Sequence, residues 1–122
     1  RRMGLVEERI DMLIQAIGES EVYQHYLNVK KEVEQNEILC QKIDEYRHKN
    51  FQLNISLEGE ELYNAMENFE RENIAFRKDP LVNQFLAAEL AVIRMVQQME
   101  KKILHAIDLK LMFAPTSYEE DE

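Results

Sequence analysis

A long uninterrupted segment near the C-terminal end constrains the fold of this chain more than any other feature. Asp79-Pro80 joins a helix-capping side chain to the residue best tolerated at the first helical position. No Pro or Gly follows until Pro115, so the sequence predicts one helix from Asp79 to Phe113. At a rise of about 1.5 Å per residue, this helix would run roughly 50 Å. A compact globule of this chain length is only about 35 Å across, so the helix is expected to extend beyond it.

The same predicted helix carries apolar side chains on two faces. One stripe comprises Leu81, Phe85, Ala88, Val92, Met95 and Met99, and the other comprises Val82, Leu86, Ile93, Val96, Ile103 and Ile107. Two apolar faces need more neighbours than the remaining helices of one subunit supply, which predicts self-association. We expect the interface to centre on six residues of this helix, namely Phe85, Val92, Met95, Val96, Met99 and Ile103.

Helical spacing of apolar residues continues through the N-terminal half. Leu5 to Ile17 is predicted to form a helix that stops at Gly18, and Ser20 is a suitable cap for the next. We expect this second helix to run from about Glu21 to Asn54, with either a bend or a new cap at Asn36-Glu37.

A further helix is predicted after a short connection from Ile55 to Glu58. Its apolar stripe steps by four and three through Leu62, Met66, Phe69, Asn73 and Phe76. Arg77-Lys78 suit its negative end, and the residue before Pro80 favours a break there. Three asparagines fall at seam positions, namely Asn36, Asn50 and Asn73. Such residues are either solvated or buried across a helix interface, where they fix register.

Composition supports an all-α fold. The chain has only three Gly and two Pro among 122 residues, which disfavours the many turns of an all-β protein. Hydrophobic residues make up 45%, enough for a core. We therefore predict long antiparallel helices forming a bundle, as one domain over residues 1–114, followed by an acidic, flexible tail over residues 115–122.

Charge and cysteine content narrow the partners and the compartment. The net charge of −9 argues against direct binding to nucleic acid, because a phosphate backbone requires a basic face. Cys40 is the only cysteine, so it forms no internal disulfide and suits a reducing compartment. There is no run of 18 apolar residues, and Glu7-Glu8 interrupt the stretch where a secretory signal would need apolar residues. We expect a cytoplasmic protein without a membrane span.

Glu45 and His48 form the best candidate for a metal site. A Glu and a His three residues apart share a helix face, as in di-iron carboxylate bundles. Such a site needs a second pair, and Glu21 with His25 has the wrong spacing of four. Arg47 and Lys49 also flank His48 with positive charge. We therefore predict no metal, no cofactor and no catalytic residues.

These residues carry a resemblance to a known family. Ser20-Glu21 with Tyr23 and Tyr26, and the stretch Asp79-Pro80-Leu81-Val82 with Phe85-Leu86-Ala87-Ala88-Glu89, are its most specific features. Others are Asn36, Leu39, Ile43, Tyr46, Phe51-Gln52, Met95, Gln98, Ile103 and Ile107. In order and spacing, the set resembles the YlbF/YmcA family of small helical bacterial proteins, which includes the YheA type, over roughly residues 5 to 113.

The resemblance implies an all-helical subunit in an intertwined homodimer, with a non-enzymatic regulatory role. It also implies membership of a complex that assists RNase Y in messenger RNA processing and influences competence, sporulation and biofilm development. One branch of the family carries a cysteine-rich tail linked to an iron–sulfur cluster. The tail here, Tyr118 to Glu122, has no cysteine and departs from that branch.

The leading hypothesis is therefore a cytoplasmic adaptor that acts through protein–protein contacts, including contacts with family members. One alternative is a structural helical module that serves an unrelated process. The other is a metal-dependent helical enzyme.

Overall fold

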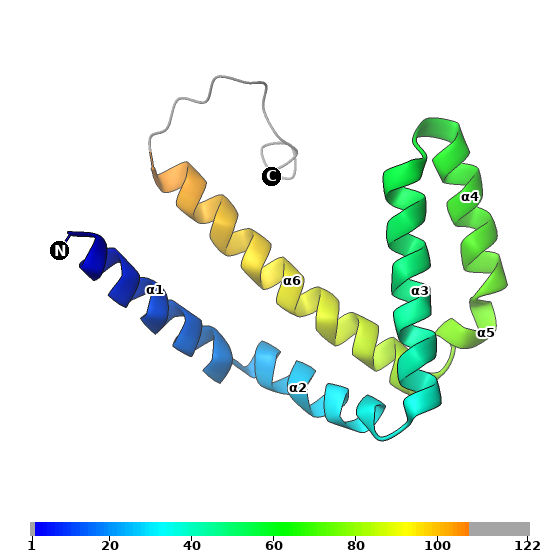
Figure 1. The fold of residues 1–122 in the computed structure, drawn as a ribbon, viewed down its shortest axis with the longest axis horizontal. Helices are drawn as coiled ribbons and strands as arrows, with labels where there is room; N and C mark the ends of the chain where they lie inside the picture. Colours follow the sequence, from blue (N-terminus) through cyan, green and yellow to red (C-terminus); the bar gives the residue numbers. More distant parts are fainter. Residues whose placement is uncertain (1, 108–122) are drawn as a thin grey trace.

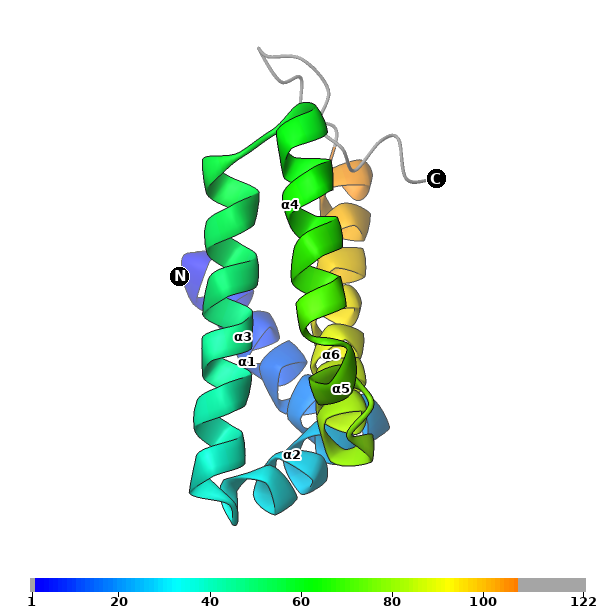
Figure 2. The same ribbon diagram turned by 90° about the vertical axis from the view of Figure 1, so that its right-hand side faces the viewer.

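A computed structural model describes the backbone of residues 2–107 and the side chains of residues 4–107. Its described part consists of helices joined by short connections and contains no strand, which confirms the predicted all-α class. The helices are α1 (Arg2–Glu19), α2 (Glu21–Glu34), α3 (Glu37–Ser56), α4 (Gly59–Glu72), α5 (Ile74–Arg77) and α6 (Pro80–Ala106). In Figure 1, α2 lies along the first half of α6. Helix α1 leads into the N-terminal end of α2, and α3 follows its C-terminal end. Figure 2 shows α3 and α4 side by side as a hairpin.

The hydrophobic core lies where α2, α3 and α6 meet. Its buried members are Val29, Val33, Ile43, Val82 and Phe85. Half-buried residues packed around them are Tyr26, Leu39, Cys40, Phe76, Leu81 and Leu86. Each fully buried aliphatic side chain contributes about 1.5–3 kcal/mol. The core therefore fixes the crossing of three helices at one end of α6, while the other end of α6 lies outside it.

The predicted helix starts at Ser20 and Asp79 are confirmed. Ser20 Oγ accepts a hydrogen bond from Tyr23 N at 3.2 Å, and Asp79 Oδ1 accepts one from Leu81 N at 2.9 Å. Pro80 occupies the first turn of α6, where its missing N–H costs nothing. The first helix ends at Glu19, one residue beyond Gly18.

The preferred prediction of one helix from Glu21 to Asn54 is wrong. The chain breaks at Asn36, whose Oδ1 accepts a hydrogen bond from Leu39 N at 3.0 Å and so caps a new helix. The alternative of a new cap is the correct one. Asn36 is exposed in this role, so it is not a buried seam residue.

A second break, which the sequence reading missed, separates α4 from α5. Asn73 Nδ2 donates to the Phe69 carbonyl oxygen at 2.7 Å, so the side chain engages the last turn of α4. Local bonds of this kind compete with helix continuation. The predicted stripe through Asn73 and Phe76 is therefore split, and α5 is a single turn that leads into Asp79.

Helix α6 has 27 residues, which corresponds to about 40 Å. It is the longest helix of the described residues, as the sequence predicts. The rest of the predicted helix, residues 108–113, and the acidic tail over residues 115–122 lie outside the described residues.

Candidate interaction surfaces

The two predicted stripes of α6 have different surroundings. Every member of the first stripe, from Leu81 to Met99, is buried or half-buried. The second stripe starts buried at Val82, but its members from Ile93 onward are about half exposed, with values of 45% for Ile93 and 48% for Val96. One face of α6 is thus covered along its length, and the other is covered only near its start.

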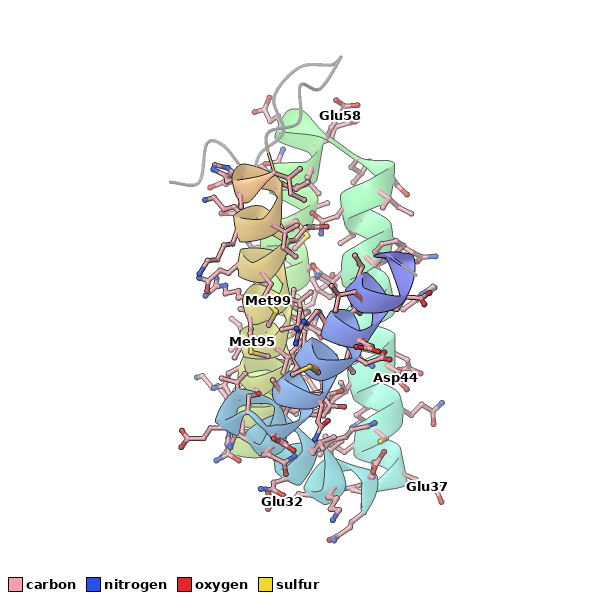
Figure 3. The ribbon with its side chains drawn as sticks, turned by 90° about the vertical axis from the view of Figure 1, so that its left-hand side faces the viewer. Glu32, Glu37, Asp44, Glu58, Met95 and Met99 are labelled. Atoms are coloured by element: carbon pink, nitrogen blue, oxygen red, sulfur yellow. The ribbon has the colours of Figure 1, made fainter. Side chains whose placement is uncertain are left out.

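The six predicted interface residues divide between the subunit core and its surface. Phe85 is buried within the subunit, where its ring lies 5.8 Å from that of Tyr26. Val92, Met95 and Met99 are half-buried, whereas Val96 and Ile103 are exposed. Figure 3 shows Met95 and Met99 along α6. Their role between subunits stays a prediction, and Phe85 leaves little surface for a second chain to cover.

Helix α1 presents a second apolar face. Its large apolar residues are between 40% and 59% exposed, namely Leu5, Val6, Ile10, Met12, Leu13 and Ile14. Among the helix pairs with substantial contact, α1 packs only on α2. A shallow hollow of about 370 Å³ along this helix is lined by Leu5, Val6, Arg9, Ile10 and Leu13. This face has the pattern of a helix that lies against a partner.

An ion-pair cluster ties α3 to α6. Arg47 donates to the Glu89 carboxylate and, at 2.8 Å, to Asp44 Oδ1, and its guanidinium lies 5.7 Å from the Phe85 ring centre. Burial lowers the pKa of Arg47, but the Asp44 hydrogen bond and the Glu89 charge outweigh burial and raise the pKa above its ordinary value. The guanidinium therefore keeps its charge and acts as a fixed link between the two helices.

An aromatic cluster holds the hairpin together. The Tyr46 ring stacks on Phe69 at 4.9 Å and lies 5.4 Å from Phe76. Arg77 Nη1 donates to Tyr46 Oη at 2.7 Å, and its guanidinium lies 5.7 Å from the same ring. Tyr46 thus joins α3 to both α4 and α5 instead of turning its hydroxyl wholly toward water.

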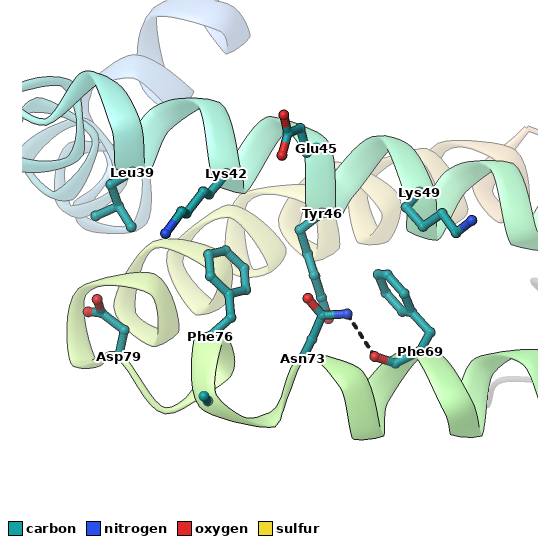
Figure 4. A pocket seen from close by; sticks show the side chains of 10 residues that line it. Leu39, Lys42, Glu45, Tyr46, Lys49, Phe69, Asn73, Phe76 and Asp79 are labelled. Atoms are coloured by element: carbon teal, nitrogen blue, oxygen red, sulfur yellow. Dashed lines mark hydrogen bonds between the residues drawn. The ribbon is translucent and has the colours of Figure 1, made fainter.

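A hollow of about 570 Å³ lies between α3 and the α4–α5 segment. Figure 4 shows Lys42 and Lys49 along one side and Phe76 and Phe69 on the other, with Asn73 bonded to the Phe69 carbonyl. Its other lining residues are Leu39, Glu45, Tyr46, Ala75 and Asp79. The lining holds no histidine, cysteine, serine or threonine.

The candidate metal residues do not form a site in the described part of the chain. Glu45, His48 and His25 are all exposed. Within residues 4–107, no group of three or more His, Cys, Asp or Glu side chains is arranged to hold an ion. None of the described helices is long and apolar enough to cross a membrane.

Sequence reading missed the contacts that join distant segments. Asp44 and Arg47 are three residues apart on one helix, so their ion pair could be predicted from the sequence. Glu89 is 42 residues from Arg47, and nothing local indicates that the two meet. The exposure of the α1 face was also missed, because its apolar spacing is the same as that of a core helix.

Comparison with known families identifies the family of this chain. The family model described as control of competence regulator ComK, YlbF/YmcA, matches residues 6–108. The chain belongs to the YlbF/YmcA family. As a YlbF/YmcA protein it falls among regulators, which supports a regulatory role. No protein of curated function and no solved structure matches the chain.

Proposed function

We propose that this chain is a non-enzymatic, cytoplasmic regulator that works as a homodimer or higher homo-oligomer and acts through protein–protein contacts. The observation that carries the proposal is the pair of exposed apolar faces on α1 and on the second half of α6. Soluble monomers rarely expose contiguous apolar surface beyond a few hundred Å². Membership of a regulatory family agrees with a protein whose surfaces recognise other proteins.

The self-association surface is centred on the second stripe of α6. Val96 and Ile103 are the exposed members of the predicted interface, and Val92, Met95 and Met99 lie beside them. Met95 also lines a hollow with Val22 of α2. Met95 therefore lies at the border between the face of α6 that α2 covers and the face that is exposed. A second subunit that covers this region would turn half-buried residues into core.

We further propose that the oligomer is an adaptor in a complex that assists RNase Y in messenger RNA processing, with effects on competence, sporulation and biofilm formation. With a net charge of −9, the protein reaches RNA through the nuclease and not by its own phosphate contacts. Tight, salt-sensitive RNA binding by the isolated protein would contradict the proposal that only the nuclease contacts the RNA.

The test of the adaptor role is genetic and uses the native host. Deleting the gene is expected to leave RNase Y-dependent transcripts uncleaved, and the wild-type gene is expected to restore cleavage. A Val96→Asp variant should fail to restore it. The matched control is Gln97→Asp, which adds the same charge at the neighbouring exposed position and should complement. Normal transcript cleavage in the deletion strain would refute the adaptor role but leave self-association standing.

The proposal also requires that the protein has no catalytic activity of its own. Elemental analysis of the purified oligomer should find no stoichiometric transition metal. A bound metal lost on replacing His48 or Glu45 by Ala would instead favour an enzyme.

A further inference from the structure

A groove lies between α3 and α6. It encloses about 460 Å³ and opens along α6, where Leu90 is 44% exposed. Its apolar floor comes from α6 and consists of Leu86, Ala87, Leu90 and Ile93. Its polar rim consists of Tyr46, Arg47, Asn50, Arg77, Asn83 and Glu89. The small side chain of Ala87 leaves room for close approach of another helix, because interaxial distance depends on the residues at the contact.

The charges of the rim select an acidic occupant. Arg47 is already neutralised by Glu89 and Asp44. Arg77 is different, because its hydrogen bond goes to the neutral Tyr46 hydroxyl and no described residue forms an ion pair with it. The groove thus sets an uncompensated cation beside an apolar floor, within a chain of net charge −9. The fitting ligand is a helix whose apolar stripe is bordered by carboxylates.

Helix α1 of this same chain has that pattern. Val6, Ile10 and Leu13 form an apolar row by helical spacing, and their side chains are exposed. Glu7 and Asp11, four residues apart, form the row along one side of these apolar residues, and Arg9 borders the other side. Within one subunit, α1 packs on α2 and takes no part in lining the groove. The molecule therefore carries an uncovered acidic amphipathic helix and an unfilled groove of complementary character.

We propose that the α3–α6 groove of one subunit receives α1 of a second copy of this chain, with Glu7 and Asp11 facing Arg77. Two-fold symmetry makes the contact reciprocal, so each dimer contains two identical helix-in-groove contacts. The inference rests on the proposed self-association and names the segment that achieves it.

Cysteine cross-linking tests the pairing directly. In a Cys40→Ser background, one chain carries Ile10→Cys and another, with a distinguishing tag, carries Ile93→Cys. A disulfide forms only when the two Cα atoms come within about 7 Å. After mixing, exchange and mild oxidation, we expect a covalent heterodimer on a non-reducing gel. The matched control replaces Ile10→Cys by Glu8→Cys, which lies on the side of α1 opposite Ile10 and outside the row of Glu7 and Asp11, and should give no heterodimer.

A charge exchange tests the role of Arg77. Arg77→Glu should weaken dimerisation about tenfold at low salt, as expected for the loss of a charged contact. Combining it with Glu7→Arg and Asp11→Arg should restore the wild-type dissociation constant, an effect that a merely structural role of Arg77 would not produce. A stable dimer that forms no Ile10–Ile93 cross-link, or no rescue by the triple variant, would overturn the pairing but not self-association. A wild-type monomer would overturn both.

Discussion

The two ends of α6 contain the same kinds of residue in different surroundings. Val82 near the start is 0% exposed, whereas Val96 in the second half is 48% exposed, although both belong to the same apolar stripe. The start of α6 packs in the core with residues of α2, α3 and α5, whereas α1 makes no substantial contact with α6. Helical spacing shows which residues share a face, but the neighbouring helices decide whether that face becomes core.

This difference separates two tasks within one helix. The buried end stabilises the subunit, because removing its side chains from water drives the crossing of three helices. The exposed end contributes little to the isolated subunit and is available to a second chain. Substitutions at the buried end should therefore act at every protein concentration, and those at the exposed end should act through assembly.

Val82→Asp is expected to have the largest effect. It places a carboxylate in a fully buried apolar site without a partner, at a cost of more than about 4 kcal/mol. That is a large part of the roughly 5–15 kcal/mol that stabilises a domain. Circular dichroism should show loss of helix at all concentrations, and native-like helicity in this variant would place the core elsewhere.

Val96→Asp introduces the same chemistry at the exposed end. In the assembled protein it would bury an unpaired carboxylate. By analogy with broken buried ion pairs, this should destabilise the assembly by about 3–5 kcal/mol. We expect an aggregated or unfolded protein, because the remaining apolar faces of α1 and α6 are left uncovered. Gln97→Asp is the matched control and should behave as wild type in light scattering. A soluble, fully helical Val96→Asp monomer would contradict the account.

Arg47→Ala should have a moderate effect at the boundary between the two regions. It removes the link from α3 to Glu89 and leaves a partly buried carboxylate without its partner. Because Arg47 is itself partly exposed to solvent, we expect a loss of only about 1 kcal/mol in the free energy of unfolding. Urea denaturation measures the loss, and Lys30→Ala, which removes an exposed pair with Glu34, should change stability much less. Equal effects of the two would show that the α3–α6 link is no stronger than a surface pair.

Asn36→Ala should give a change no larger than that of Arg47→Ala, at the low end of the range for a lost cap, because Asn36 is exposed. It removes the cap of α3, where replacement by Ala costs about 0.5–2 kcal/mol and replacement by Gly only a few tenths. Thermal unfolding of Asn36→Ala, with Asn36→Gly as the control, measures the difference. If Asn36→Ala were as stable as wild type, the cap would not be what divides α2 from α3.

The sequence predicted those features of the fold that depend on neighbouring residues. The caps at Ser20 and Asp79, the first-turn Pro80 and the long helix after it all follow from local chemistry. The breaks at Asn36 and Asn73 are also local, but the helical spacing of four and three continues through both asparagines and does not show where a helix ends. Only the hydrogen bonds in the structure decide between them.

Long-range contacts could not be predicted in the same way. Arg47 meets Glu89 because of how α3 is placed against α6, and Tyr46 meets Phe69 and Phe76 because of how α3 packs against α4 and α5. No spacing rule connects such distant positions. The proposed interface shows the same limit, since Phe85 and Val96 share helical spacing but only Phe85 is enclosed by its own subunit.

The most direct test of the central claim is the mass of the wild-type protein in solution. Multi-angle light scattering at micromolar concentration should give a dimer or a larger homo-oligomer, with a helix content that falls on dilution as the subunits separate. A stable, fully helical monomer of 14.5 kDa under these conditions would show that the exposed faces of α1 and α6 need no second copy, and would contradict the account.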